Sequence, residues 1–186
     1  MKTLKTALIL FTLFSVILGL LYPFAMTGIA QLTFPYKAKG SMIINNSKIV
    51  GSELIGQSFS QEVYFQGRPS AVNYDGNGSG ASNLGPTEPK LQEQISERLR
   101  IIREINAFWQ NQCIPSDLIM SSASGLDPHI STASAMLQVP RIAKARHMNE
   151  TDIQFLISSH TENLLVGVPY VNVLKLNLAL NELNIK

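Results

Sequence analysis

The sequence predicts an α+β protein with one N-terminal transmembrane helix, residues 1–34, followed by a single soluble domain, residues 35–186. No charged residue lies between Lys5 and Lys37, which is typical of a membrane span. After it, short apolar runs flank a turn signal, and farther on apolar residues recur at steps of three and four. We therefore expect a strand or hairpin region first and several helices after it.

The densest apolar part, residues 7–30, would span about 36 Å as a helix, against a hydrocarbon core of about 30 Å. A cleaved secretory signal is the alternative, with the sequence Gly28-Ile29-Ala30 as its cleavage site. The apolar run continues past the length that a signal needs, which favours a retained anchor. Small residues and a kink at Ser15, Gly19 and Pro23 would let another membrane helix approach.

Charges next to the span barely decide its orientation, because Lys2 and Lys5 on one side face Lys37 and Lys39 on the other. The simplest insertion keeps the short N-terminal tail in the cytoplasm and exports the domain. All 13 acidic residues and 13 of the 15 Lys and Arg follow the span, so the exported part has no net charge. A neutral domain is a poor nucleic-acid binder, and we exclude that class. The single cysteine, Cys113, excludes an internal disulfide.

The soluble domain begins with a predicted hairpin over residues 41–57, turning at Asn45-Asn46-Ser47. Residues 67–89 then form a long loop, rich in glycine and with three prolines, which we interpret as a packed binding surface. An amphipathic helix follows, with Thr87 as its cap and Pro115 at its end. Its apolar face consists of Leu91, Ile95, Leu99, Ile102, Ile105 and Trp109. Further helices are predicted at residues 132–148, 151–160 and 171–183.

Few residues carry a catalytic signal. Asp127 and His129 lie two residues apart in a turn, and His160 with Glu162 forms a second such pair. A metal site or a base can be built from them, but an Asp before Pro128 is more often a turn former. Neither a nucleophile elbow nor a phosphate loop of the Gly-Lys-Ser/Thr type is present in the sequence. The sequence therefore assigns no catalytic and no metal-binding residue.

Five ordered blocks resemble the C subunit of the bacterial high-affinity potassium-transporting ATPase, the Kdp system. They are GSELIGQ (residues 51–57), YFQGRPSA (64–71), SGASNLGP (79–86), SGLDPHIS (124–131) and VNVLKLNLAL (171–180). With the span before them, they place the resemblance along nearly the whole chain. The sequence departs from the family pattern at Ala81, where a glycine is usual, and at His147-Met148, where Gly-Leu is usual.

The resemblance implies a non-catalytic subunit of the inner membrane that stabilises the complex and raises the ATP affinity of a P-type ATPase subunit, as a catalytic chaperone. Its other implied partners are a channel-like potassium-translocating subunit and a small single-span subunit. The complex uses ATP, K⁺ and Mg²⁺, and no cofactor is assigned to this chain. The expected partner-contact residues come from the family motifs: Gly67, Arg68, Pro69, Ser79, Gly80, Ser82, Asn83, Leu84, Gly85, Pro86, Ser124, Gly125, Asp127, Pro128, His129 and Asn172.

Two other classes stay open on the sequence. One is a membrane-anchored extracytoplasmic hydrolase that uses Asp127, His129 or His160. The other is a solitary binding protein released by cleavage after Ala30.

Overall fold

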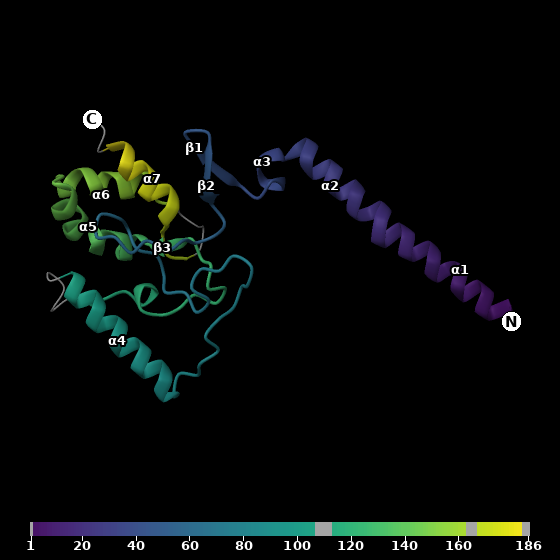
Figure 1. Ribbon diagram of the computed structural model, residues 1–186, viewed down its shortest axis with the longest axis horizontal. Helices are drawn as coiled ribbons and strands as arrows, with labels where there is room; N and C mark the ends of the chain where they lie inside the picture. The colour runs from purple at the N-terminus through teal and green to yellow at the C-terminus, as the bar shows by residue number, and fades with distance from the viewer. Residues whose placement is uncertain (1, 107–112, 163–166, 184–186) are drawn as a thin grey trace. The chain divides into compact units, whose positions relative to one another are not determined.

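The computed structural model describes residues 2–106, 113–162 and 167–183 (Figure 1). The chain divides into two compact units, Met1–Ser52 and Glu53–Lys186. Each unit has its own elements and is described by itself.

The first unit begins with one continuous helix of 32 residues, Lys2–Thr33. It comprises α1 (Lys2–Val16), a π-helical turn η1 (Ile17–Leu21) and α2 (Tyr22–Thr33). Its length and composition are sufficient to cross a membrane, and none of its side chains is buried within the protein. The hydroxyls of Thr6, Thr12, Thr27 and Thr33 each donate to the carbonyl four residues earlier, as Thr12 does to Leu8 at 2.9 Å. Polar groups on an apolar helix are thereby satisfied inside the helix, as the absence of water in a bilayer core requires.

The π-helical turn lies directly before Pro23 and has a physical cause in the ring of this proline. A proline inside a helix has no N–H to donate and collides with the carbonyl four residues earlier, here that of Gly19. In the widened turn, the N–H of Tyr22 instead donates to the carbonyl of Ile17, five residues earlier. The predicted kink residue therefore sits where the helix locally changes its hydrogen bonding.

The predicted hairpin is confirmed. After the short helix α3 (Pro35–Ala38), β1 (Met42–Asn45) pairs antiparallel with β2 (Lys48–Ser52). The two-residue turn consists of Asn46 and Ser47, with φ of 48° and 62°. Positive φ at both positions is the geometry of the turns that match the twist of paired strands, and Asn adopts it readily.

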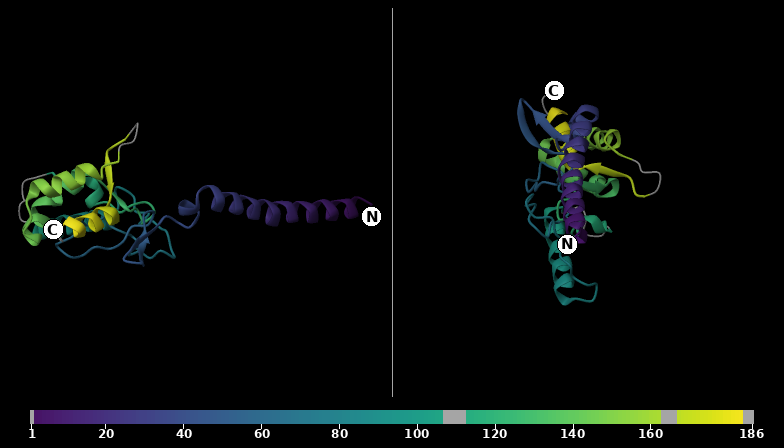
Figure 2. Two further views of the ribbon diagram at one scale, coloured as in Figure 1. Left: turned by 90° about the horizontal axis from the view of Figure 1, so that it is seen from above. Right: turned by 90° about the vertical axis from the view of Figure 1, so that its right-hand side faces the viewer.

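The second unit contains the remaining elements. They are α4 (Pro89–Ile105), the 3₁₀ turn η3 (Ser116–Leu118), β3 (His129–Ser131), α5 (Thr132–Arg146), α6 (Glu150–Ser159), β4 (Tyr170–Asn172) and α7 (Val173–Leu183). Figures 1 and 2 show α5, α6 and α7 side by side, with α4 extending from them. The core lies among these three helices and the β3–β4 pair, with Ile130, Ile142, Ile157, Val171 and Leu176 among its side chains.

Each predicted helix of the second unit is present, but several begin or end at residues other than those predicted. Helix α4 starts at Pro89 with Glu88 as the preceding cap residue, not Thr87, and ends at Ile105 rather than near Pro115. The predicted face residue Trp109 lies outside the described residues. Strands β3 and β4 were not predicted; they form a three-residue antiparallel pair and lie on either side of α5 and α6 in the chain. Strands this short carry no period that separates them from their surroundings.

The end of α5 explains one departure from the family pattern. His147 has φ 55° and ψ 41°, in the left-handed region where helices usually end on glycine. The N–H of Met148 donates to the carbonyl of Ala143 at 3.0 Å, and Met148 packs against the core. These contacts form a Schellman ending, in which His147 occupies the position where glycine is favoured.

Candidate functional site

The family motifs that lie apart in the sequence meet in one place in the second unit. We define the motif surface as residues 67–86 together with residues 124–131. The Gly80 N–H donates to the carbonyl of Ser124 at 2.9 Å, and the Ser79 hydroxyl donates to the same carbonyl at 3.0 Å. The Ser70 hydroxyl donates to the carbonyl of Gly125 at 2.6 Å. The long glycine-rich loop is therefore packed, as predicted, and held by hydrogen bonds to the 124–131 turn.

Gly125 is the point of closest approach between the two loops. Its φ is 68°, and a Cβ there would lie 2.7 Å from the carbonyl oxygen of Gly80 and 2.6 Å from a methyl of Val72. Only glycine combines this backbone conformation with so near a neighbouring backbone. Gly85, in the same motif surface, has open space around it, so not every motif glycine is required for packing.

Asp127 organises the turn. Its carboxylate accepts from Arg68 Nη1 at 3.0 Å and from the backbone N–H of His129 at 3.0 Å. Burial by itself would raise its pKa, but hydrogen bonds from His129 and Arg68 outweigh that effect and hold the pKa of Asp127 below its usual value. The hydroxyl of Tyr74 donates to the carbonyl of Arg68, and burial, followed by the charge of Asp127, raises the pKa of Tyr74.

His129 and Asn172 face each other as register partners of β3 and β4. The His129 ring lies 3.4 Å from the Asp127 carboxylate and edge-on to the ring of Tyr170, with centroids 4.7 Å apart. Asn172 donates to the carbonyl of Glu53 at 2.7 Å and accepts from the N–H of Lys175 at 3.1 Å. Asn172 therefore connects the start of this unit to the first turn of α7.

His160 is not part of this cluster. Its Nδ1 lies 2.9 Å from the carbonyl of Leu156 and 3.1 Å from the Ser159 hydroxyl, at the end of α6. Within the described residues no hydrogen bond or ion pair joins it to Asp127 or His129. Among residues 2–106, 113–162 and 167–183, no three His, Cys, Asp or Glu side chains are placed to hold a metal ion.

The remaining predicted residues lie at the edges of the motif surface. Ser82 and Leu84 line a shallow hollow beside the first turns of α4, together with Lys90 and Arg98. Asn83 has a left-handed backbone with φ 53°, and the carbonyl of Gly85 accepts from the N–H of Glu88. The other motif residues lie directly beside the ones above: Gly67 and Pro69 beside Arg68, Pro86 beside Gly85, and Pro128 beside Asp127.

Side chains of the helices anchor residues 62–66, and none of these side chains was predicted from the sequence. The backbone N–H and carbonyl of Phe65 both pair with the Asn177 amide, at 2.8 and 3.0 Å. Gln66 pairs in the same way with Gln138 of α5, at 2.8 and 3.1 Å. In effect these amides replace a neighbouring strand. Polar residues on the buried face of a predicted helix are the only sequence signal for such contacts.

Arg141 completes this connection from inside the protein. It is 5% exposed, and its guanidinium donates to the carbonyls of Glu62 and Tyr64 and to the side chains of Asn106 and Gln138. Burial lowers its pKa to about 10, so it stays charged at neutral pH. The segment before the motif surface, α5 and the residue after α4 are thus joined through one side chain.

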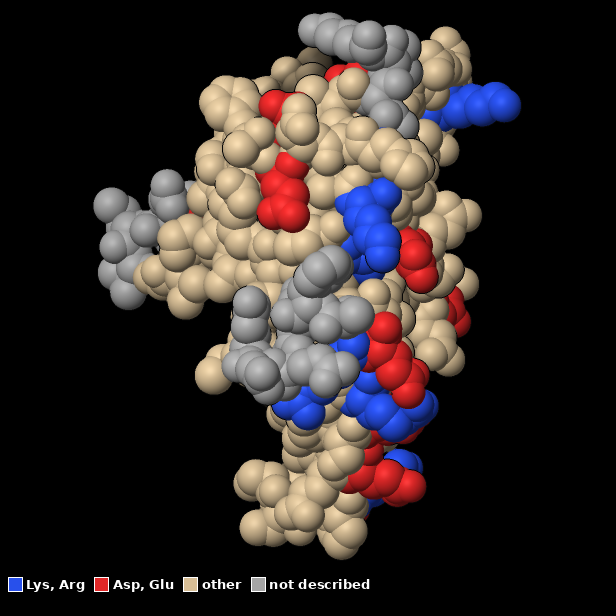
Figure 3. Space-filling model, turned by 90° about the vertical axis from the view of Figure 1, so that its left-hand side faces the viewer, with Lys and Arg blue, Asp and Glu red and all other residues tan. Residues whose placement is uncertain are grey.

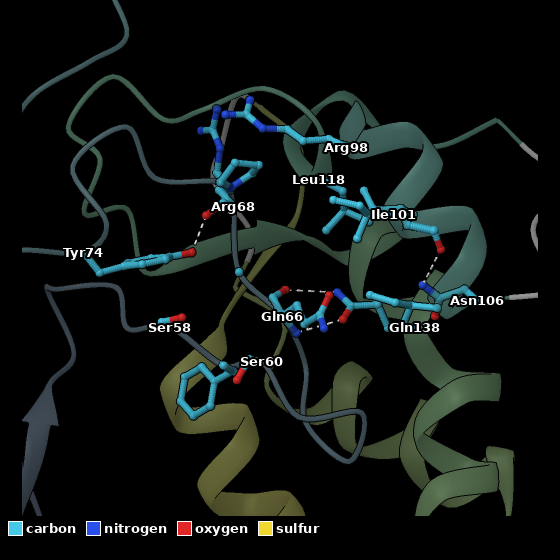
Figure 4. A pocket seen from close by; sticks show the side chains of 15 residues that line it. Ser58, Ser60, Gln66, Arg68, Tyr74, Arg98, Ile101, Asn106, Leu118 and Gln138 are labelled. Atoms are coloured by element: carbon cyan, nitrogen blue, oxygen red, sulfur yellow. Dashed lines mark hydrogen bonds between the residues drawn. The ribbon is translucent and has the colours of Figure 1, made fainter. Parts of the chain in front are cut away.

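A cavity of about 330 Å³ lies between this segment and α4 (Figure 4). One wall is apolar, formed by Ile101, Ile102 and Ile105. Gln66 and Gln138 also line the cavity, and the Gln138 amide is bonded to the Gln66 backbone. Both Arg68 and Arg98 line it, and Figure 4 shows their guanidinium groups at the same edge. On the outer side of α4, acidic and basic side chains alternate (Figure 3), as in the ion pairs of Arg100 with Glu97 and Glu104.

In the first unit, Ser15, Gly19 and Pro23 lie on the apolar helix within and beside the π-helical turn. A side chain added at Gly19 would meet nothing within 4 Å. The position is therefore open to a neighbour from outside the chain.

These features define a class of protein: a chain with one N-terminal apolar helix, consistent with a single-pass membrane anchor, and a folded second unit that presents a packed loop surface. The family described as K⁺-transporting ATPase, c chain, matches residues 4–182, and the chain belongs to this family.

The chain is also similar to curated proteins over nearly their whole length. The chain is 49% identical to the potassium-transporting ATPase KdpC subunit of Caldanaerobacter subterraneus subsp. tengcongensis, over 97% of this chain and 93% of that relative. It is 46% identical to the KdpC subunit of Dechloromonas aromatica, over 99% of this chain and 100% of that relative. It is 45% identical to the KdpC subunit of Geobacter sulfurreducens, over 98% of this chain and 99% of that relative. The chain is thus related to subunits of a potassium transport complex.

Proposed function

We propose that this chain is a non-catalytic accessory subunit of an ATP-driven potassium import complex. It assembles and stabilises the complex and raises the ATP affinity of the P-type ATPase subunit. The match of the family to residues 4–182 carries this proposal. The motif surface, in which the family blocks meet, supplies the physical basis for a docking role.

The proposed arrangement is a single pass through the bacterial inner membrane, with the N-terminus in the cytoplasm and residues 35–186 outside it. The long apolar helix supports the span. Its face at Ser15, Gly19 and Pro23 packs against helices of the partner subunits, because small residues permit close approach in a bilayer. The channel-like potassium-translocating subunit, the P-type ATPase subunit and the small single-span subunit are the proposed partners.

The motif surface is the proposed contact with the translocating subunit. Its loops lack regular structure, yet hydrogen bonds to Ser124 and Gly125 and the pair of Arg68 with Asp127 hold them in place. A loop that is already ordered loses little conformational entropy on docking, which favours affinity.

The effect on ATP affinity follows from coupling between sites. ATP and Mg²⁺ are bound by the hydrolysing subunit in the cytoplasm, so a domain outside it acts only by favouring one of two states of its partners. This chain then needs no nucleotide site of its own. This chain would bind its partners more tightly in one of the two states, and the difference in binding free energy would set the size of its effect on ATP affinity.

The test replaces Gly125 with alanine in the whole complex. The new Cβ would collide with the carbonyl of Gly80 and force a left-handed alanine, so the two loops of the motif surface must move apart. Gly85→Ala is the matched control, because nothing lies within 4 Å of the added Cβ. A tag at the C-terminus permits purification in mild detergent, followed by measurement of bound partner subunits and potassium-stimulated ATP hydrolysis.

We expect Gly125→Ala to reduce both partner recovery and the apparent ATP affinity, and Gly85→Ala to leave both unchanged. Full recovery of the partner subunits and normal ATP hydrolysis with Gly125→Ala would show that the motif surface does not contact the partners. The hydrolase alternative has its own signature in the same preparation: the chain purified alone would hydrolyse a substrate, and His129→Ala would abolish that activity.

A further inference from the structure

We propose that the cavity beside α4 binds an amphiphilic monocarboxylate, with its apolar tail against α4 and its carboxylate between Arg68 and Arg98. This site goes beyond the docking role above, since a small ligand would occupy it within this chain.

The shape and lining of the cavity fit the tail. Its volume of about 330 Å³ lies within the range of small-molecule pockets. Ile101, Ile102 and Ile105 of α4 line it together with Phe59 and Leu118, and Figure 4 shows Leu118 beside Ile101. Ile101 remains 39% exposed, so the apolar wall continues to the surface. Such a wall gains from contact with an apolar chain because apolar area leaves water.

The charge of Arg98 favours an anionic ligand, because its hydrogen-bond acceptors in the protein are uncharged. Its guanidinium donates to the carbonyl of Ile119 at 2.7 Å and to the Ser121 hydroxyl at 3.1 Å, and both acceptors are neutral. Burial lowers the pKa of Arg98, and no carboxylate offsets this effect. Within the described ranges, Arg98 forms no ion pair. Arg98 is partly buried, and a bound anion would give it the charge-assisted partner that its two neutral acceptors do not supply.

The charges around the cavity favour a ligand with a single negative charge. Two guanidinium groups line it, and Asp127 neutralises one of them through its 3.0 Å contact with Arg68. No acidic residue is among those that line this cavity in the described part of the chain. One carboxylate would therefore balance the site, and a planar carboxylate matches the fork of a guanidinium.

The side chain of Arg68 supports the same edge of the cavity. Its Nε–H is buried and has no hydrogen-bond acceptor within the described residues. Buried donors are normally satisfied, so this one is an exception that calls for a partner. A carboxylate oxygen that enters beside Arg68 would provide the acceptor after a small rotation of the side chain. The side-chain amide of Gln138 is already engaged by the backbone N–H and carbonyl of Gln66, which leaves recognition of the head group mainly to the two arginines.

The test uses the full-length chain in nanodiscs of zwitterionic phosphatidylcholine and octanoate labelled with ¹³C at its carboxyl carbon. Binding is followed by the ¹³C signal during titration, with empty nanodiscs as the background. We expect saturable binding that Arg98→Gln weakens by about tenfold or more, because a charge-assisted pair is lost. Arg100→Gln is the matched control: Arg100 lies on the same helix, pairs with Glu97 and Glu104 outside the cavity, and should alter affinity by less than about twofold.

A second variant keeps the test decisive if Arg98→Gln does not fold. Ile101→Glu changes a surface-exposed position and places a carboxylate at the rim. It should abolish octanoate binding without altering thermal unfolding, whereas Ile101→Gln should retain most of it.

Three results would overturn the proposal. Binding that is equal in Arg98→Gln and Arg100→Gln would exclude the arginine edge. Octanol that binds as tightly as octanoate would exclude the carboxylate. Inorganic phosphate that binds with the same dependence on Arg98 would make this a small-anion site without an apolar tail.

Discussion

The amide of Asn177 takes the place of a neighbouring strand for Phe65, and removing it should release the segment before the motif surface. Asn177 is 2% exposed, and Phe65 is fully buried. Asn177→Leu keeps a side chain that branches at Cγ, and leucine favours the helix more than asparagine does, so α7 itself should stay formed. The substitution deletes the acceptor of the Phe65 N–H at 2.8 Å and the donor to the Phe65 carbonyl at 3.0 Å.

The magnitude follows from those two bonds. A net hydrogen bond is worth about 1 kcal/mol, and a buried polar group left without a partner costs about 1–3 kcal/mol. Two buried backbone groups lose their partners here, so we expect a loss of about 2–5 kcal/mol in local stability. A domain of this kind has a total of about 5–15 kcal/mol, so the loss is large but can leave the fold populated.

Hydrogen exchange of the full-length chain in nanodiscs measures this loss at the right place. Since about 1.4 kcal/mol corresponds to a tenfold change, exchange of the Phe65 amide should accelerate roughly 30-fold to several-thousand-fold. Asn181→Leu is the matched control on the same helix, because Asn181 is only half-buried and accepts one bond, from Arg146 at 2.8 Å. Equal exchange in the two variants, or exchange at Phe65 as slow as in the unaltered chain, would show that the Asn177 amide does not hold this segment.

Two further predictions concern the anchor and the end of α5. Gly19→Leu should reduce co-purification of the partner subunits, because it fills the helix face that a neighbouring helix would approach. Gly28 lies nine residues further on and on roughly the opposite face, so Gly28→Leu should not reduce it. Equal recovery with both variants would exclude the face at Gly19 as a contact. His147→Gly should stabilise the second unit by about 1 kcal/mol, since His147 is exposed and holds a left-handed backbone. Thermal unfolding measures the gain, and His147→Ala, which keeps a Cβ, should not reproduce it.

The local sequence pattern was enough to predict the elements that are stabilised by residues near to them in the chain. The continuous apolar stretch specified the Lys2–Thr33 helix, and Asn46 with Ser47 specified the hairpin turn. The periodic apolar steps located α4, α5, α6 and α7, although the end of α4 at Ile105 did not follow from them. Apolar spacing continues past that residue in the sequence, and a helix ends where its backbone groups find other partners, which spacing does not encode.

The motif surface was anticipated in its residues but not in its geometry. Glycines, prolines and short polar residues marked a packed loop, and the family blocks marked the turn around Asp127. That Arg68 is the partner of Asp127, 59 residues away, was not readable. Nor was the pairing of Phe65 with Asn177, 112 residues away. The identity of a single asparagine or arginine does not reveal its hydrogen-bond partner, because both residue types are also common at exposed positions where they have no partner in the chain.

The long apolar helix, the helices of the second unit, the hairpin and the family can be read from the sequence, because each rests on local periodicity or on ordered motifs. The contacts of Asp127 with Arg68 and His129, the separate position of His160 and the lack of a counter-ion for Arg98 among the described residues become visible in the folded chain. Such contacts depend on the positions of distant backbone segments. Those positions follow from burial of the whole core rather than from any one stretch of the chain.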